Sequence, residues 1–337
     1  MDSLTQLTLG AACAEKILGK EVGRQAWVWG AVLGTLPDLD VFIPFGGPVN
    51  DMVFHRGFSH SFFLLALLSP IVAWFITKIH PQTKKHFFKW MLLTFVVFQA
   101  SVVIDLMTIY GTQVFWPFDK TPQAIPVLFI IDPFFSLPIV FGCFAALILK
   151  RKSTLGHRLN SIGLSISVAY LAWSIFAWQF AENKVKGKLK QQSISYSQLI
   201  TSASPFNTLL WRVVGVDKDQ YFETYYSLFD GDEPLFVDHY PRNLSLKEPL
   251  QNHSPVKNLA HFTRGYYAFE KREETIAMKD LRMGSEPNYV FTFRVGEIQD
   301  SVIVPVTDEQ LRAPRDMSGL TWIWDRIWTP LPQNSKL

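Results

Sequence analysis

The sequence predicts a polytopic α-helical membrane domain followed by a smaller soluble α+β domain with mainly antiparallel strands. Four apolar stretches in the first part are close to the roughly 20 residues that a helix needs to cross a bilayer. Charge is sparse there: residues 1–181 hold 13 Lys/Arg and 9 Asp/Glu, against 19 and 20 in residues 182–337. The second part alternates short apolar and aromatic runs with turn residues. We therefore expect a membrane domain over 1–181 and a soluble domain over 182–337.

The expected spans are the four longest apolar runs of the chain. They are Ser61–Ile79, Phe88–Tyr110, Val127–Leu149 and Leu159–Ala181. Two shorter stretches, Leu4–Leu18 and Ala26–Pro37, precede them and are too short for a comfortable span. They are compatible with a re-entrant pair or with short spans packed against the others.

Basic residues in the connecting segments predict the orientation, because cytoplasmic loops are enriched in Lys and Arg. Eleven fall on one side of the expected topology: Lys16, Lys20, Arg24, Lys78, Lys84, Lys85, Lys89, Lys150, Arg151, Lys152 and Arg158. On the other side, residues 39–60 and 111–127 hold only Arg56 and Lys120. If both short stretches cross, Asp2, residues 38–60, residues 105–127 and the carboxy-terminal domain lie on the outer face. We expect that domain to be extracytoplasmic.

Two further features of composition exclude other functions. The net charge is only +3, and basic residues gather in short loops, so we expect no nucleic-acid partner. Cys13 and Cys143 both lie in apolar segments and have no metal or redox spacing, which predicts buried thiols.

Several Asp and His residues in or beside the apolar segments of the membrane part fall near the outer face of this topology. They are Asp38, Asp40, His55, His60, Asp105 and Asp132. A carboxylate inside an apolar span is costly unless it is paired, hydrated or bound to a metal. Asp oxygens and neutral His nitrogens are ligands for Zn, Mn or Fe, and such a cluster could hold one or two metals that activate a water.

The spacing of the two histidines requires a loop. His55 and His60 would point about 140° apart on one helix, so a shared metal needs a turn between them, which Gly57 permits. Ser59 is a reasonable N-cap for the span that follows.

Structural interpretations of the same residues are also open. Asp38 and Asp40 would suit the end of a helix in a solvated loop. His60 would suit a capping or interfacial position. Asp105 would be neutralised by pairing with Arg56.

Several longer motifs carry a family resemblance. They are MDSLTQ at 1–6, GTLPDLD at 34–40, FHRGFSHS at 54–61, IDLMTIYGTQVFWPF at 104–118 and IIDPFFSLP at 130–138, with SPFNTLLWRVV, YYSLFDG, HFTRGYYAF and DLRMG further on. Through them the chain resembles bacterial inner-membrane proteins described as membrane-bound metal-dependent hydrolases (domain of unknown function 457, LexA-binding hydrolases). The resemblance implies a multi-pass hydrolase of the bacterial inner membrane that uses a divalent metal ion (Zn, Mn or Fe).

The resemblance also implies the metal-site positions. They are Asp2, Asp38, Asp40, His55, His60 and Asp105. Two histidines that the family usually has are absent, with Gln6 four residues after Asp2 and Ser101 four residues before Asp105. These departures imply one metal fewer, a harder oxygen-preferring metal, or no activity.

The soluble part has strand-like runs of about five to nine residues. They are Tyr221–Phe229, Tyr266–Phe269, Thr275–Leu281, Asn288–Val295 and Ser301–Val306, with a short helix expected at Ser254–Phe262. Trp322, Trp324 and Trp328 would suit either an interfacial anchor on the bilayer or a packed core.

The leading functional hypothesis is a hydrolase that acts on a lipid or lipid-linked phosphoester, with membrane lipids as its surroundings. Catalytic roles are expected for Asp38 and Asp105, one carboxylate acting as general base, and for Arg56, which would neutralise a substrate phosphate. The alternative is a non-catalytic membrane scaffold or sensor that has lost part of the metal site. A transporter is less compatible, because the ionisable groups gather at one face rather than near the midplane.

Overall fold

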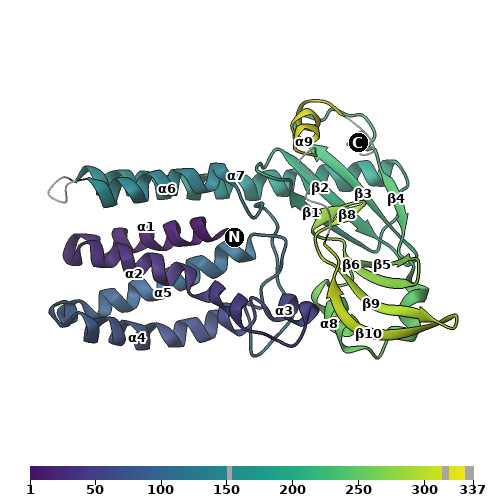
Figure 1. The fold of residues 1–337 in the computed structure, drawn as a ribbon. Helices are drawn as coiled ribbons and strands as arrows, with labels where there is room; N and C mark the ends of the chain where they lie inside the picture. The colour runs from purple at the N-terminus through teal and green to yellow at the C-terminus, as the bar shows by residue number, and fades with distance from the viewer. Residues whose placement is uncertain (150–153, 313–318, 331–337) are drawn as a thin grey trace. The chain divides into compact units, whose positions relative to one another are not determined.

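The computed structural model describes residues 1–149, 154–312 and 319–330. The chain divides into two compact units (Figure 1). The first comprises Met1–Phe42 and His55–Ser174, and the second comprises Ile43–Phe54 and Ile175–Leu337. A helical region with apolar spans precedes a domain of antiparallel sheets, so the predicted fold class is confirmed. The basic loop expected at Lys150, Arg151 and Lys152 lies outside the described residues.

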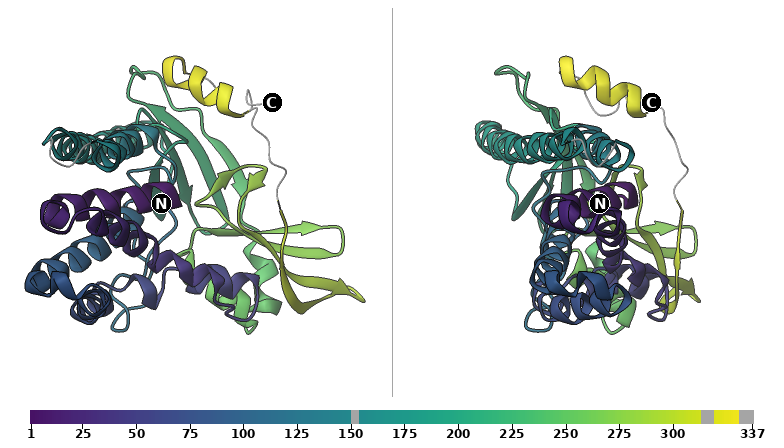
Figure 2. Two further views of the ribbon diagram at one scale, coloured as in Figure 1. Left: turned by 60° about the vertical axis from the view of Figure 1, so that its left-hand side comes forward. Right: turned by 90° about the vertical axis from the view of Figure 1, so that its left-hand side faces the viewer.

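The first unit is helical, and its helices pack side by side (Figure 2). They are α1 (Ser3–Val22), α2 (Arg24–Thr35), α4 (Phe62–Ile79), α5 (Phe87–Leu106), α6 (Pro133–Ile148) and α7 (Leu155–Gln191), with 3-10 turns η1 (Pro37–Phe42), η2 (Phe58–His60) and η3 (Pro81–His86). The helix α7 runs through the domain boundary expected at residue 182.

Among the residues that the structure describes, three helical segments are long and apolar enough to cross a membrane: Phe62–Ile79, Pro81–Leu106 and Leu155–Gln191. Their outward faces carry large apolar side chains. On α4, for example, Leu67 is 70% exposed and Phe75 is 55% exposed. Such a surface suits contact with lipid chains rather than with water.

The predicted start of the third span, Val127, is wrong. Within Val127–Leu149 the helix α6 begins only at Pro133 and has 16 residues, fewer than a comfortable span. Asp132 caps it by accepting hydrogen bonds from the amides of Phe134 at 3.0 Å and Phe135 at 3.3 Å. Proline at the first helical position reinforces this start, because it has no amide hydrogen to leave unpaired.

The expected ends of two other spans also shift. The helix α5 ends at Leu106 rather than at Tyr110. The N-cap of α4 is Ser61 rather than Ser59, and its side chain accepts from the Leu64 amide at 3.2 Å. Ser59 instead lies within η2 and is free to serve the site described below.

The two short apolar stretches fold as α1 and α2, whose backbones are in close contact. A Cβ atom added at Gly10 would lie 2.2 Å from the Gly30 carbonyl oxygen, and one at Gly34 would lie 2.4 Å from the Gln6 carbonyl oxygen. Small residues allow this approach, as in packed membrane helices.

In its described residues, the second unit contains two four-stranded antiparallel sheets, drawn in green to yellow in Figure 2. One has the order β1 (Gln198–Ala203), β2 (Leu210–Val216), β3 (Gln220–Ser227), β4 (Asp238–Pro241); the other has the order β10 (Val302–Gln310), β9 (Thr292–Gln299), β6 (Thr275–Asp280), β5 (Tyr267–Arg272). A short pair, β7 (Gly284–Ser285) and β8 (Asn288–Tyr289), and the helical segments α3 (Pro48–Phe54), η4 (Leu244–Leu250), α8 (Ser254–Phe262) and α9 (Gly319–Trp328) complete it.

The strand predictions are mostly confirmed, and the helix at Ser254–Phe262 forms as α8. The run expected at Asn288–Val295 divides into β8 and the start of β9, whereas β1, β2 and β4 were not predicted. Trp322 packs in a core with Tyr225, at 4.9 Å between ring centroids, while Trp324 and Trp328 are exposed.

Candidate metal site

Three separate elements of the first unit converge on one group of possible metal ligands. Asp38 comes from η1, His60 from η2 and Asp105 from the last turn of α5. Their ligand atoms all lie within 4.8 Å of one another. The Nε2 atom of His60 is 3.1 Å from Asp38 Oδ1 and 3.1 Å from Asp105 Oδ2.

The triad Asp38, His60 and Asp105 is buried on one side and open on the other. The side chains of His60 and Asp105 have no exposed surface, whereas that of Asp38 is 21% exposed. Solvent can therefore reach the triad at Asp38.

The proton on His60 can be assigned from its neighbours. Ser59 donates its one hydroxyl proton to Asp40 Oδ2, so at 2.9 Å from His60 Nδ1 it can only accept. Nδ1 is therefore the protonated nitrogen, and Nε2 is directed at the two carboxylates. Burial lowers the pKa of His60, but hydrogen bonds to Asp105 and Asp38 outweigh burial and raise the pKa above its usual value. Nε2 thus faces a position where a proton or a metal cation is favoured.

Asp40 holds the loop that carries the histidines. Its carboxylate contacts His55 Nδ1 at 2.6 Å, accepts from the Arg56 amide at 2.9 Å and accepts from Ser59. Burial raises its pKa, but the hydrogen bonds to His55 and Ser59 outweigh that effect, so the pKa lies below its usual value. Asp40 and His55 therefore lie one contact away from the triad, in the position of groups that orient a ligand.

Arg56 makes the turn between the two histidines and also carries its charge into the site. Its φ of +60° is left-handed, so the strained residue of this loop is Arg56 rather than Gly57, where the sequence suggested the turn. Both of its backbone groups are held, the amide by Asp40 and the carbonyl by the Gln113 amide at 3.0 Å. Its guanidinium lies 2.9 Å from Asp105 Oδ1. The strain is thus maintained by contacts that aim the charge at Asp105.

The position of the missing family histidine is occupied by a hydrogen-bond donor. Gln6 Nε2 donates to Asp105 Oδ2 at 3.0 Å, while Gln6 Oε1 is buried and has no hydrogen-bond partner among the described residues. The amino group of Met1 also contacts Asp105 Oδ1. Ser101, at the second missing histidine, donates instead to the Gly34 carbonyl oxygen at 3.1 Å. Ser101 and Asp105 are four residues apart, a spacing that places both on one face of α5, and this spacing could have indicated from the sequence that both face α1.

Two other acidic residues are N-caps of helices. Asp2 caps α1 and accepts from the Thr5 amide at 3.0 Å. Asp132 caps α6 and accepts from the Tyr170 hydroxyl at 3.0 Å. Neither belongs to the converging ligand group, and the ligand roles of Asp2, Asp40 and His55 stay predictions.

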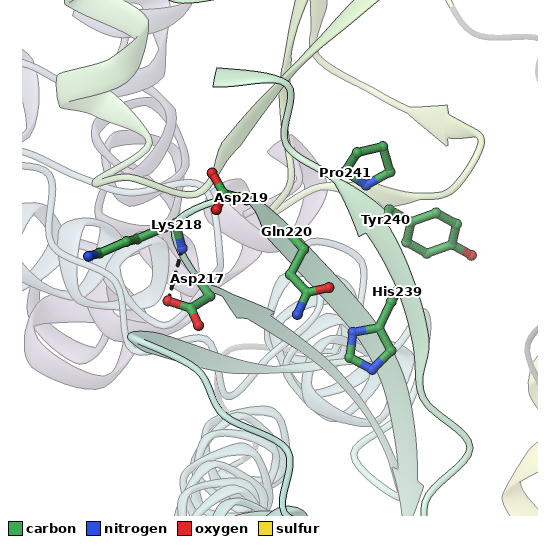
Figure 3. A pocket seen from close by; sticks show the side chains of 7 residues that line it. All are labelled: Asp217, Lys218, Asp219, Gln220, His239, Tyr240 and Pro241. Carbon is green, nitrogen blue, oxygen red and sulfur yellow. Dashed lines mark hydrogen bonds between the residues drawn. The ribbon is translucent and has the colours of Figure 1, made fainter. Parts of the chain in front are cut away.

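The second unit has a depression of about 630 Å³ at the β2–β3 turn and the edge strand β4 (Figure 3). It is lined by Asp217, Lys218, Asp219, Gln220, His239, Tyr240 and Pro241. None of the site residues expected from the sequence is among them.

The comparisons with known proteins bear on the helical part. A family model described as "YdjM inner membrane protein" matches residues 1–181, which is more than half of the chain. The chain belongs to this family. Membership in the YdjM family confirms the inner-membrane resemblance seen in the motifs. The matched residues include Asp38, His60 and Asp105, so the whole triad lies in the part of the chain that this family shares.

One curated relative is "Uncharacterized protein YfhP" from Bacillus subtilis (strain 168). It is 28% identical over 142 residues, which cover 40% of this chain and 42% of the relative. The chain thus matches less than half of that relative's length. No solved structure matches this YdjM-family chain.

Proposed function

We propose that this protein is a multi-pass metal-dependent hydrolase of the inner membrane that acts on a lipid or lipid-linked phosphoester. The observation that carries the proposal is the placement of His60 Nε2, 3.1 Å from an oxygen of Asp38 and 3.1 Å from an oxygen of Asp105. Ligands bound at about 2.0–2.1 Å to one metal are about 2.9–3.4 Å apart for octahedral to tetrahedral angles. The two distances from His60 Nε2 match this range.

The donor set fits a divalent cation in its chemistry as well. Two carboxylate oxygens and one imidazole nitrogen suit Zn, Mn or Fe. A metal held by Asp38, His60 and Asp105 would supply an activated water at neutral pH. The hydrogen bond between Ser59 and His60 presents Nε2 rather than Nδ1 to that position.

The partial exposure of Asp38 suits a role in proton transfer. It is the triad residue that solvent reaches, so it can accept a proton from an attacking water and release it to bulk solvent. Asp105 is fully buried and bound by fixed donors, which suits a ligand rather than a base.

Arg56 has a different resting role from the one expected from the sequence. Its side chain is only 4% exposed and is paired with Asp105. A substrate phosphate would therefore have to approach along the side of Arg56 that faces Asp38, 3.9 Å away. We keep phosphate neutralisation by Arg56 as part of the proposal.

The basic connecting segments support an outer location for the site and for the carboxy-terminal domain. The triad residues stand at the ends of apolar elements, where lipid headgroups would lie. A phosphoester at headgroup depth is the substrate class that this location favours.

Metal analysis of the full chain, purified in detergent without chelator, tests the proposal. We expect about one equivalent of divalent metal in the wild type and loss of it in His60→Ala and Asp105→Asn. His239→Ala and Asp119→Asn, which change residues outside the triad, are controls that should keep the metal. Wild-type protein that takes up no metal on addition of Zn, Mn or Fe would contradict the proposal.

One observation favours the second candidate, a scaffold or sensor without catalysis. Asp105 already accepts from Arg56 and Gln6 and faces His60 Nε2. These partners can neutralise a buried carboxylate without a metal. Stable, folded protein that is free of metal and indifferent to its addition would support this candidate.

A further inference from the structure

The segment Ile43–Phe54 belongs to the second unit, although the residues on both sides of it carry the metal site. The turn η1, with Asp38, ends at Phe42. His55 follows Phe54 directly, and His60 is five residues further on. The carboxylate and the histidine of the triad are therefore attached to opposite ends of a segment that another unit holds.

Asp308 of β10 holds the first turn of α3 within this segment. Its Oδ2 atom accepts from the Val49 amide at 2.7 Å, and the residue is only 9% exposed. The register of β10 against β9 shifts between Pro305 and Glu309, and such a bulge redirects a side chain out of the regular pleat. Gly47 has a φ of +133°, and a Cβ atom there would lie 2.9 Å from Asp308 Oδ1. The glycine is thus required both by its conformation and by the approach of Asp308.

Further contacts make the segment a fixed part of the second unit. Asn258 of α8 donates to Asn50 Oδ1 at 2.8 Å. Asp51 accepts from the Phe45 amide at 2.6 Å, which closes the loop before α3. Val49, Met52 and Val53 are buried. Movement of this segment would therefore require movement of β10 and α8.

The site depends on where the segment ends. Asp40, which precedes the segment, holds His55 and the Arg56 amide, which follow it, and these bonds help to maintain the left-handed backbone of Arg56. We propose that the carboxy-terminal domain positions the metal site through Ile43–Phe54, with Asp308 as the positioning residue. For the metal itself this inference rests on the proposed function.

Hydrogen exchange on the full chain in detergent tests the proposal without a metal. Asp308→Ala should speed exchange of the amides in residues 48–54 and, by about tenfold, of the Arg56 and His60 amides. Asp308→Asn can still accept from Val49 and should restore slow exchange. Glu309→Ala changes the exposed neighbour on the same strand and should leave both regions unchanged.

The second readout is zinc affinity, which Asp308→Ala should weaken by about tenfold, the smaller effect expected for residues that orient ligands. Faster exchange confined to residues 48–54, with the Arg56 and His60 amides unchanged, overturns the proposal. If Asp308→Ala does not fold, Asn258→Ala replaces it, with Asn252→Ala as control. Failure of the wild type to bind zinc counts against the proposed hydrolase and leaves the exchange result as the test of positioning.

Discussion

Ser59 Oγ lies 2.9 Å from His60 Nδ1, and this contact determines which nitrogen of His60 faces the two carboxylates. The hydroxyl can accept from Nδ1 because its own proton goes to Asp40. The chain of contacts from Asp40 through Ser59 to His60 thus fixes one tautomer of the buried His60. Outer contacts of this kind set both the orientation and the basicity of a metal ligand.

Replacement of Ser59 tests this arrangement. Ser59→Ala removes the acceptor for Nδ1–H, so we expect metal affinity to fall about 10-fold to 100-fold. Ser59→Thr keeps the hydroxyl and should remain close to wild type. The measurement is zinc titration by calorimetry on the detergent-purified chain. Equal affinity in Ser59→Ala and wild type would show that the hydroxyl does not control His60.

The buried pair of Arg56 and Asp105 makes a prediction about stability. Arg56→Met should destabilise the protein by about 3–5 kcal/mol, because it removes one partner of a buried carboxylate. The double variant Arg56→Met with Asp105→Asn should recover part of that loss, since no buried charge remains. Thermal unfolding of all variants in one detergent measures the coupling. Additive losses in the double variant would contradict it.

Much of the fold could be predicted because apolar length and charge distribution are local properties of the sequence. The start of α6 was predicted six residues too early. Hydropathy alone extended the span back to Val127, whereas Asp132 and Pro133 together are a helix-start signal within the apolar run. The signal was present, but apolar length outweighed it.

The sequence predicted which residues form the site better than it predicted the role of each residue. Topology placed Asp38, His60 and Asp105 on one face, and the structure brings them together. That Asp40 supports the loop and that Gln6 donates to Asp105 depend on the packing of α1 and of the turns, which residue type does not encode. The attachment of Ile43–Phe54 to the second unit depends on Asp308, which is 259 residues from Val49 in sequence.

The close contact of α1 with α2 predicts that Gly30 cannot be enlarged. A Cβ atom there would lie 2.4 Å from Ala14 Cβ and 2.4 Å from the Gly10 carbonyl oxygen. Gly30→Ala should therefore cost about 1–3 kcal/mol of stability, as overpacking does. Gly187→Ala in α7 is the matched control, because a Cβ there would meet no described atom within 4 Å, and it should be neutral or slightly stabilising. A thermal shift assay that finds both variants alike would contradict the close packing.

In the second unit, Arg212 and Glu223 form a buried ion pair on β2 and β3 at 2.6 Å. The Tyr289 hydroxyl also donates to Glu223, and the side chain of Glu223 has no exposed surface. Arg212→Met removes the cationic partner of this buried carboxylate, and we expect a loss of about 3–5 kcal/mol. Arg272→Met breaks the exposed pair with Glu270 and should cost at most about 1 kcal/mol. Chemical denaturation followed by the tryptophan fluorescence of the full chain compares the two, and similar losses would show that burial of the Arg212 pair does not control its contribution.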